Sequence, residues 1–252
     1  MPKETGSSSG GVLGLSEITE NHSIWKMLIA ECLGTLILVF ICCGSCIGIN
    51  QSPDYVPYVQ IALTFGFTVA SIAQAIGHIS GCHINPAVTV SFLCTGNIKL
   101  VKAVLYIVVQ CVGAIGGAAL LRLVTPNEKV GSLGLTIVSP QLTAGQGLLV
   151  EAILTFLLVF VVHGVCDSNR KDIAGSIPVA IGLAVSAAHL CGIQYTGSSI
   201  NPARTFGPAV IMNSWEYHWV YWVGPLLGGV VAGILYRTLF RVRKGESDGY
   251  DF

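Results

Sequence analysis

The stretch SGCHINPA (residues 80–87) has a counterpart further along the chain, TGSSINPA (residues 196–203), and both end in Asn-Pro-Ala. Each stretch is polar, and each lies between apolar runs long enough to cross a bilayer. One Asn-Pro-Ala alone is weak evidence, because the tripeptide also suits an ordinary loop that leads into a helix. Two copies in matched surroundings are specific. The best physical reason for a doubled polar element inside an apolar chain is a pore.

The composition indicates a membrane protein. Of the 252 residues, 52 % are hydrophobic and 10 % are charged, whereas a soluble domain carries about 25 % charged residues. Apolar runs of about 20 residues, the length that crosses the hydrocarbon core, recur along the chain. Six crossings are too many for a signal peptide or a single anchor. We therefore expect an all-α membrane protein with spans near 25–48, 57–77, 100–123, 146–166, 174–191 and 217–239.

Two shorter apolar segments, about 85–95 and about 201–211, remain after the spans are assigned. At about 1.5 Å per residue each reaches only half way across a bilayer, which predicts two re-entrant half-helices. Asparagine is a good N-cap, and proline suits a first helical turn, where its missing N–H has no intrahelical partner. We therefore expect Asn85-Pro86-Ala87 and Asn201-Pro202-Ala203 to start the half-helices, with each asparagine as the cap.

The similarity between the two halves extends beyond these motifs. AECLGTLILVF (residues 30–40) opens the first span, and VEAILTFLLVF (residues 150–160) opens the fourth, with Glu, Thr, Val and Phe in register. Each half, about 24–124 and about 145–240, thus holds three spans and one half-helix. An odd number of spans reverses the second copy, which makes an inverted repeat about an axis in the membrane plane. The half-helices then enter from opposite faces, and their N-termini meet near the midplane.

Small residues in the third and sixth spans predict close helix packing. Lipid offers little hydrophobic drive for helix association, so small side chains that let helices approach one another are favoured at the contacts. The residues concerned are Gly113 and Gly117 in the third span and Gly224 and Gly228 in the sixth.

The positive charges fall on one side of the predicted membrane. Ten of the 13 Lys and Arg residues lie in the two termini and in the second and fourth connections, and the first connection has none. By the positive-inside rule the tails, residues 1–23 and 241–252, are cytoplasmic, and an even number of crossings agrees. A glycosylation sequon at Asn50 is then on the outer side, but its nearness to the membrane and to Pro53 argues against its use. The formal net charge of zero implies no nucleic-acid partner.

Two facing half-helices give the centre of a pore a definite chemistry. A helix N-terminus carries about half a positive charge, so two such ends repel cations. The side-chain amides of Asn85 and Asn201 can point into the space ahead of each helix and donate to the oxygen of a passing water. A water held in this way breaks the donor–acceptor alternation that a proton relay needs.

With these motifs the sequence resembles the aquaporins, of the major intrinsic protein family, over about residues 24–240. GHISGCHINPAVT (residues 77–89) and YTGSSINPARTFGP (residues 195–208) carry the resemblance, and both motifs are highly specific. The resemblance implies a channel domain of six tilted helices and two half-helices, with one pore per subunit and usually a homotetramer. It also implies a multi-pass protein of the plasma membrane with water as permeant, and no cofactor or metal is expected.

The family places its narrowest point outside the asparagine pair, and motif position assigns it here to Phe65, His189, Ser198 and Arg204. Arginine at membrane depth costs from a few to more than about 10 kcal/mol unless it meets water or a partner, and its charge adds to the cation barrier. A neutral His189 both donates and accepts. Taken alone, Phe65 would be an ordinary core residue and His189 a structural histidine. Together they leave room for water but for little else.

The same comparison favours water over larger solutes. Glycerol-conducting relatives replace that histidine by a small residue and carry an aspartate five positions after the arginine, where this chain has Ala209. They also differ around Tyr221 and Trp222, where this chain keeps the aromatic pair of water channels. The resemblance thus implies a passive, water-selective channel that excludes protons and ions. The alternative is an aquaglyceroporin-like channel that also passes glycerol, urea or peroxide.

Glu31 and Glu151 are the only acids well inside the spans. An intramembrane acid is a functional candidate by default, often in a proton relay. The symmetric positions favour a paired structural role instead, in which each accepts hydrogen bonds from the non-helical backbone that leads into a half-helix. Among the histidines, His83 either lines the pore or is a satisfied loop residue, and His163, near a span end, is explained by the membrane interface.

The nine cysteines are an odd number and lie mostly within the spans, so no disulfide framework is expected. Most of them fit small, buried apolar positions. Cys82, three residues before Asn85, is predicted to line the pore. Many mammalian water channels carry their mercury-sensitive cysteine where this chain has Ser198, so mercurials, if they inhibit, are expected to act through Cys82 and less so through Cys191.

Three other classes of function fit less well. An enzyme could use Ser198 with His189, but the chain has no Gly-x-Ser-x-Gly elbow and no metal-binding His/Glu array. An adhesive membrane protein would need more surface than the short loops offer. A proton-coupled transporter shares the inverted repeat, but it needs a titratable coupling site, for which only Glu31 and Glu151 are available.

Overall fold

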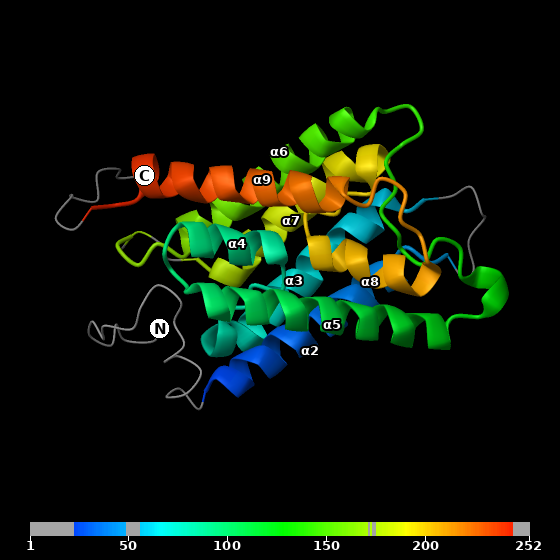
Figure 1. Cartoon of the computed structure of the whole chain (residues 1–252), viewed down its shortest axis with the longest axis horizontal. Helices are drawn as coiled ribbons and strands as arrows, with labels where there is room; N and C mark the ends of the chain where they lie inside the picture. The colour runs from blue at the N-terminus through cyan, green and yellow to red at the C-terminus, as the bar shows by residue number, and fades with distance from the viewer. Residues whose placement is uncertain (1–22, 49–55, 171, 173–174, 244–252) are drawn as a thin grey trace.

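The structure is a computed structural model that describes residues 23–48, 56–170, 172 and 175–243, and within them the fold is all-helical (Figure 1). The predicted tail before residue 23, the sequon at Asn50 and the tail after residue 243 lie outside the described residues. The helices are α2 (Ile24–Gly44), α3 (Tyr58–Ser80), α4 (Pro86–Cys94), α5 (Leu100–Val124), the 3-10 turn η1 (Asn127–Lys129), α6 (Ala144–Val165), α7 (Ile177–Thr196), α8 (Pro202–Met212), α9 (Val220–Leu235) and the π-helix η2 (Tyr236–Phe240).

Six helices of the described chain are long and apolar enough to cross a bilayer, and they are α2, α3, α5, α6, α7 and α9 with η2. The two short helices, α4 with 9 residues and α8 with 11, follow the two Asn-Pro-Ala motifs. This arrangement confirms the prediction of six spans and two half-helices. The helix ends differ by a few residues. The fifth span, for example, continues to Thr196 rather than stopping near 191, and it ends at Gly197, whose φ of 79° reverses the chain.

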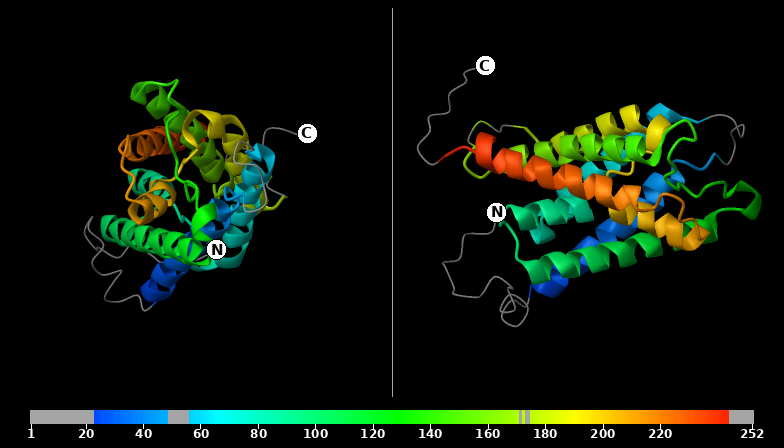
Figure 2. Two further views of the ribbon diagram at one scale, coloured as in Figure 1. Left: turned by 90° about the vertical axis from the view of Figure 1, so that its right-hand side faces the viewer. Right: turned by 45° about the horizontal axis from the view of Figure 1, so that its top comes forward.

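The long helices pack in pairs that follow the repeat. In the first half α2 packs against α5, in the second half α6 packs against α9, and α3 packs against α7 across the two halves. Figure 2 shows these helices side by side, tilted against one another. The half-helix α4 packs on α9 of the opposite half and on α5 of its own half. The half-helix α8 packs mainly on α5 of the opposite half and also contacts α9 of its own half.

Glycine is required at the centres of the two main helix pairs. A Cβ at Gly113 would overlap the carbonyl group of Cys32 on α2, and a Cβ at Gly228 would overlap the carbonyl group of Ala152 on α6. The backbones of each pair therefore approach as closely as the chain allows, as predicted for membrane helices that pack through small residues. The other two glycines lie in the same way, Gly117 against Leu36 and Gly224 against Leu148.

The two half-helices lie in line, with their N-termini directed at each other (Figure 1). Each starts as its sequence predicts. Asn85 is the N-cap of α4 and Asn201 is the N-cap of α8, both in extended backbone conformation, and a proline occupies the first turn of each. The meeting point of the two N-termini fixes where the polar groups of both halves come together.

Candidate conduction pore

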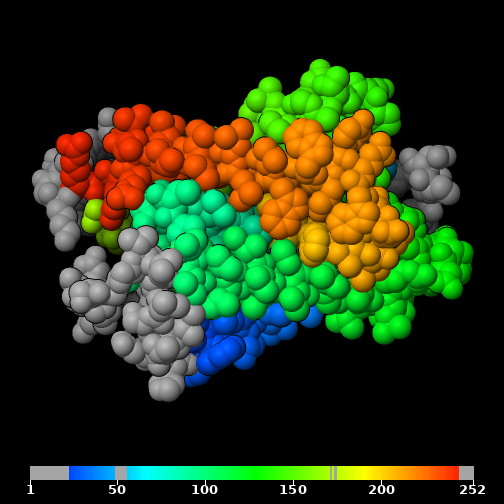
Figure 3. Space-filling view, viewed as in Figure 1, coloured from blue at the N-terminus to red at the C-terminus, as the bar shows by residue number. Residues whose placement is uncertain are grey.

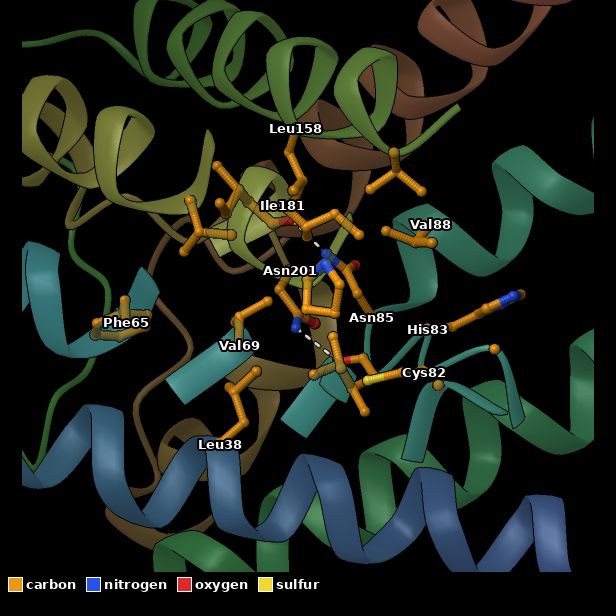
Figure 4. Close-up of a pocket in the computed structure, with 18 of the residues that line it drawn as sticks. Leu38, Phe65, Val69, Cys82, His83, Asn85, Val88, Leu158, Ile181 and Asn201 are labelled. Carbon is orange, nitrogen blue, oxygen red and sulfur yellow. Dashed lines mark hydrogen bonds between the residues drawn. The ribbon is translucent and has the colours of Figure 1, made fainter. Parts of the chain in front are cut away.

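A cavity of about 520 Å³ lies between the long helices and is lined by residues of both halves (Figure 4). One wall follows α7, which contributes Ile177, Ile181, Val185 and His189. Because these residues are spaced by four, they form one stripe along the helix, and the cavity follows this stripe for about 18 Å. The rest of the wall is mostly apolar, so the few polar groups that reach the cavity decide what it does.

The amides of Asn85 and Asn201 lie next to each other in the middle of the cavity (Figure 4). The side-chain Nδ2 of Asn85 donates to the carbonyl of Ile200 at 2.8 Å, and Nδ2 of Asn201 donates to the carbonyl of Ile84 at 2.8 Å. Each half-helix cap is therefore bonded to the loop of the opposite half. An amide nitrogen carries two hydrogens, so one N–H of each asparagine is used by these bonds and one is left for the cavity.

The other side of each amide caps its own helix. Oδ1 of Asn85 accepts from the backbone N–H of Ala87 at 2.8 Å. Oδ1 of Asn201 accepts from the backbone N–H of Ala203 at 3.1 Å and of Arg204 at 3.3 Å. With the oxygen held by the helix and one N–H held by the opposite loop, neither amide can rotate without losing hydrogen bonds. The remaining N–H groups are thus fixed in direction.

The loops before the half-helices have an unusual backbone. Cys82 and Ile84 in the first, and Ser198 and Ile200 in the second, have φ values between 42° and 50°. The left-handed region is rare for residues other than glycine, and for a β-branched residue such as isoleucine it costs free energy. This conformation persists because the backbone groups of both loops are held by hydrogen bonds from deeper in the protein.

Glu31 holds the first loop. Its Oε1 accepts from the backbone N–H of His83 at 2.9 Å and from the hydroxyl of Ser80 at 2.6 Å. Its Oε2 accepts from the backbone N–H of Ile84 at 2.6 Å and from Nε2 of Gln110 at 2.8 Å. The carboxylate is fully buried. Four donors therefore converge on it. Two of them are backbone N–H groups of the loop, which would otherwise lack a hydrogen-bond acceptor at this depth in the membrane.

Glu151 holds the second loop in the same way. Its Oε1 accepts from the backbone N–H of Ser199 at 2.9 Å and from the hydroxyl of Thr196 at 2.6 Å, and its Oε2 accepts from the backbone N–H of Ile200 at 2.8 Å. This side chain is fully buried too. Glu31 and Glu151 thus have matching contacts in the two halves, and neither lines the cavity.

Phe65, His189 and Arg204 lie together at one end of the cavity. The rings of Phe65 and His189 have centroids 3.9 Å apart, and the guanidinium carbon of Arg204 lies 5.1 Å from the centre of the Phe65 ring. Nη1 of Arg204 donates to the carbonyl of Gly134, in the connection between α5 and α6. This connection therefore reaches in from outside the repeats to fix the charge at the cavity wall.

The hydrogen-bond partner of His189 determines its tautomer. Nδ1 lies 2.9 Å from the carbonyl oxygen of Val185, which can only accept, so Nδ1 carries the proton. In the neutral ring Nε2 is then an acceptor. Nε2 of His189 and Nε of Arg204 are both buried with no partner among the described residues. Such orphaned polar atoms need water, so this end of the cavity offers a donor and an acceptor side by side.

Ser198 differs from the other three residues assigned to the narrowest point. It is fully buried and is not part of the cavity lining. Its hydroxyl donates to the carbonyl of Ala188 at 3.2 Å, and Ala188 directly precedes His189 on α7. The structure therefore brings three of the four residues to the cavity wall and puts the fourth behind it. The reason is the left-handed backbone at Ser198, which directs its side chain to α7.

Some of the cysteine thiols line the cavity and others do not, a distinction that the sequence could not show. Cys82 is half-buried and lines the cavity beside Asn85 (Figure 4). Cys191 is exposed on α7 and does not line it. Cys166, just after α6, lies on the wall at the opposite end from Arg204. Sequence reasoning missed Cys166, because its place depends on how the end of α6 meets α4 and α7.

His163, expected at the membrane interface from its place near a span end, is packed against the half-helix α4. It is buried, and its Nε2 lies 2.9 Å from the hydroxyl of Ser91 on α4. Its ring lies 4.7 Å from that of Phe92, a residue of the cavity wall. A Cβ at Gly233 on α9 would overlap the Ser91 hydroxyl, so that glycine makes room for the pair. A polar residue late in an apolar span was the only signal, and it did not reveal the partner.

His83 packs against the same aromatic ring, that of Phe92. Its ring is stacked on that of Phe92 with centroids 4.9 Å apart, and its Nδ1 lies 3.1 Å from the hydroxyl of Thr89. It also borders the cavity, so the two readings of the sequence, a lining residue and a satisfied loop residue, both describe part of its position. Phe92 thus contacts the rings of both His83 and His163.

Comparisons with known proteins agree with this geometry. The sequence profile of the Major intrinsic protein family matches residues 18–236. Aquaporin-4 of the mouse (Mus musculus) is 54 % identical over 221 residues, which are 87 % of this chain and 68 % of the relative. Aquaporin FA-CHIP of the frog Pelophylax lessonae is 43 % identical, covering 90 % of this chain and 87 % of the relative. Aquaporin-1 of the pig (Sus scrofa) is 42 % identical, covering 88 % and 84 %.

Among solved structures, the X-ray structure of the aquaglyceroporin from Plasmodium falciparum superposes with a TM-score of 0.76. It covers 86 % of this chain and 96 % of that chain at 23 % identity, so it supports the fold. The chain belongs to the major intrinsic protein family. Within that family it is an aquaporin, a multi-pass membrane channel for water and not an enzyme.

Proposed function

We propose that this protein conducts water selectively and passively, in single file past the asparagine pair, and that it excludes protons and ions. The observation that carries the proposal is the fixed pair of amides. Asn85 and Asn201 each have an oxygen held by their own helix and one N–H held by the opposite loop, at 2.8 Å in both cases. Each then has one N–H of fixed direction to offer.

These N–H groups act on water by orienting it. A water that accepts from both amides has its two hydrogens directed along the cavity, away from the midplane. The waters on either side then point in opposite directions, and a proton cannot pass along the chain without reorienting the central one. The positive ends of α4 and α8 add an electrostatic barrier to any cation, including a hydrated proton.

Size selection belongs, in this proposal, to the end of the cavity that holds Phe65, His189 and Arg204. The ring centroids of Phe65 and His189 are 3.9 Å apart. This supports size selection there, because the two rings fill space that a solute with a carbon skeleton, such as glycerol, would need. A water replaces its lost hydrogen bonds by accepting from Nε of Arg204 and donating to Nε2 of His189. Ser198 does not line the cavity in this proposal; its hydrogen bond to the carbonyl of Ala188 helps to hold α7 beside His189.

We also propose the domain limits, the orientation and the assembly. The channel domain is residues 24–240, with repeat one about 24–124 and repeat two about 145–240. The protein lies in the plasma membrane. Both flanking tails, residues 1–23 and 241–252, are on the cytoplasmic side, as the distribution of Lys and Arg favours. The family resemblance favours a homotetramer, in which each subunit keeps its own pore because each chain holds a complete cavity.

A direct comparison of two solutes tests the proposed selectivity. Purified protein in liposomes is mixed rapidly with an impermeant osmolyte to measure water flow, and with glycerol to measure solute entry and re-swelling. Water permeability far above that of empty liposomes, with glycerol entry no faster than in empty liposomes, is expected. Glycerol entry that rises with the amount of protein would instead support the aquaglyceroporin-like alternative.

A further inference from the structure

A second cavity, of about 150 Å³, lies beside the conduction cavity where α9 ends. It shares Phe92 and Cys166 with the conduction cavity, and Arg237 and Arg241 form part of its wall. The same two arginines line an outer hollow together with Leu239 and Phe240. Figure 3 shows this end of α9 at the surface, next to α4. The two arginines thus stand between an inner polar hollow and an outer, partly apolar one.

Most of the hydrogen-bonding capacity of these arginines is unused. Nη1 of Arg237 donates to the carbonyl of Thr95, at the end of α4. Across residues 23–48, 56–170, 172 and 175–243, no other side-chain hydrogen bond or ion pair involves Arg237 or Arg241. A guanidinium group has five N–H donors in a planar fork that matches a phosphate or carboxylate. The pair can therefore offer donors to an anion without giving up contacts that hold the fold.

The carboxylate in the inner hollow, Asp167, makes no ion pair with either arginine within the described part of the chain. Oδ2 of Asp167 accepts from the hydroxyl of Tyr236 at 3.2 Å and from the backbone N–H of Val242 at 3.1 Å, and Oδ1 accepts from the backbone N–H of Asn169 at 3.0 Å. Both oxygens are thus occupied by neutral donors. Asp167 ties the end of α9 to the connection after α6 and leaves the arginines to face the hollows.

The position relative to the membrane identifies the ligand. Leu239 is 70 % exposed and Phe240 is 53 % exposed, and both lie on the last turn of the sixth span. Apolar side chains so exposed at a span end face lipid, and the arginines beside them are then at headgroup depth. We propose that Arg237 and Arg241 bind the phosphate of an anionic membrane lipid. Its headgroup enters the inner hollow, and its glycerol backbone lies against Leu239 and Phe240.

Native mass spectrometry of the full-length protein, released from detergent, tests this site by counting bound lipids. The probes are phosphatidylinositol 4-phosphate, phosphatidylcholine as a neutral lipid, and inorganic phosphate. The native chain is expected to retain the phosphoinositide with at least roughly tenfold higher affinity than phosphatidylcholine, about 1.4 kcal/mol. The double variant R237Q/R241Q is expected to lose that preference. The double variant R122Q/K129Q, which removes two positive charges at the far end of the molecule, should keep it.

Arg241→Gln alone guards against a folding effect, because the Arg241 side chain makes no hydrogen bond or ion pair among the described residues. This single change should already weaken phosphoinositide binding. Equal phosphoinositide binding by the native chain and by R237Q/R241Q would overturn the proposal. Binding of inorganic phosphate as strong as that of the phosphoinositide, and equally dependent on the arginines, would also overturn it, because the ligand would then be a free anion. Neither result depends on water conduction, so the site stands or falls separately from the proposed function.

Discussion

At the scale of single residues, the chemistry of the cavity rests on atoms that the protein leaves without a partner. Nε2 of His189 and Nε of Arg204 are buried and unbonded among the described residues, and both side chains lie against the ring of Phe65. Elsewhere in the site the polar atoms of the loops are held by Glu31 and Glu151. The contrast separates residues that handle the permeant from residues that hold the shape.

Removing either group should widen the range of solutes. His189→Ala removes one of two rings in contact, and Arg204→Val removes the charge. Each is expected to raise glycerol permeability by roughly tenfold or more, equivalent to about 1.4 kcal/mol of barrier. Arg204→Val should also raise the leak of protons and cations, because it removes a fixed positive charge. Solute entry into proteoliposomes measures both effects.

The control for that pair is Arg122→Val, which removes an arginine bonded to Asn127 and distant from the cavity. It should leave glycerol and proton permeability unchanged. Unaltered glycerol exclusion in both His189→Ala and Arg204→Val would show that size selection occurs elsewhere along the cavity.

Mercurials offer a test of the cavity thiols. Cys82 lies on the wall beside Asn85, so a mercury atom bound there should block the file of water. Cys82→Ser is expected to lose most of any mercury inhibition of water flow, and Cys191→Ser, a change outside the cavity, is expected to keep it. Inhibition that persists unchanged in Cys82→Ser would remove Cys82 from the account and leave Cys166 as the remaining thiol of the cavity wall.

At the scale of elements, the half-helices could be predicted from the sequence in type, start and cap. The Asn-Pro pairs specify both helix starts, and the odd number of spans per half specifies their opposite directions. The contacts that join the halves could not be predicted. The hydrogen bond from Asn85 to the carbonyl of Ile200 depends on the left-handed backbone of both loops. No pattern of residue types predicts that four non-glycine residues adopt this conformation.

The buried acids give a prediction at this scale. Glu151→Gln keeps the shape of the side chain but replaces one acceptor oxygen by an N–H₂, which then faces a backbone or hydroxyl donor. A buried donor left without an acceptor costs about 1–3 kcal/mol, so the variant should unfold at a lower temperature in detergent. Glu128→Gln, at an exposed acid outside the spans, should not change the unfolding temperature. A proton flux through the native protein that Glu151→Gln lacks, at full stability of the variant, would support the relay interpretation instead.

The close packing of the helix pairs gives a second prediction at this scale. Gly228→Ala would put a methyl group onto the carbonyl of Ala152, whereas Gly77→Ala adds one where no atom lies within 4 Å. Overpacking costs about 1–3 kcal/mol, and alanine is a better helix former than glycine. Thermal unfolding should therefore show Gly228→Ala to be less stable than the native protein and Gly77→Ala to be at least as stable. Equal stability of the two variants would show that the close approach of α6 and α9 is not needed.

At the scale of the whole molecule, the six spans, the inverted repeat and the family followed from hydropathy, spacing and the two motifs. What the sequence did not show lies where elements distant in the chain or separate in the fold meet. His163 was assigned to the interface from its place near a span end, and a single sequence could not show that its partner, Ser91, lies in the other half of the chain. The role of Ser198 at the narrowest point stays a prediction from motif position, and the structure adds the bond from its hydroxyl to the carbonyl of Ala188. A single sequence reveals periodicity within an element more readily than contacts between distant ones.

One preparation can test whether the same cavity conducts water and excludes protons. Purified protein in liposomes that enclose a pH-sensitive dye is exposed first to an osmotic step and then to a pH step. The account predicts shrinkage far faster than in empty liposomes, in proportion to the amount of protein, and a proton leak equal to that of empty liposomes. Shrinkage no faster than in empty liposomes, or a proton leak that grows with the amount of protein, would contradict it.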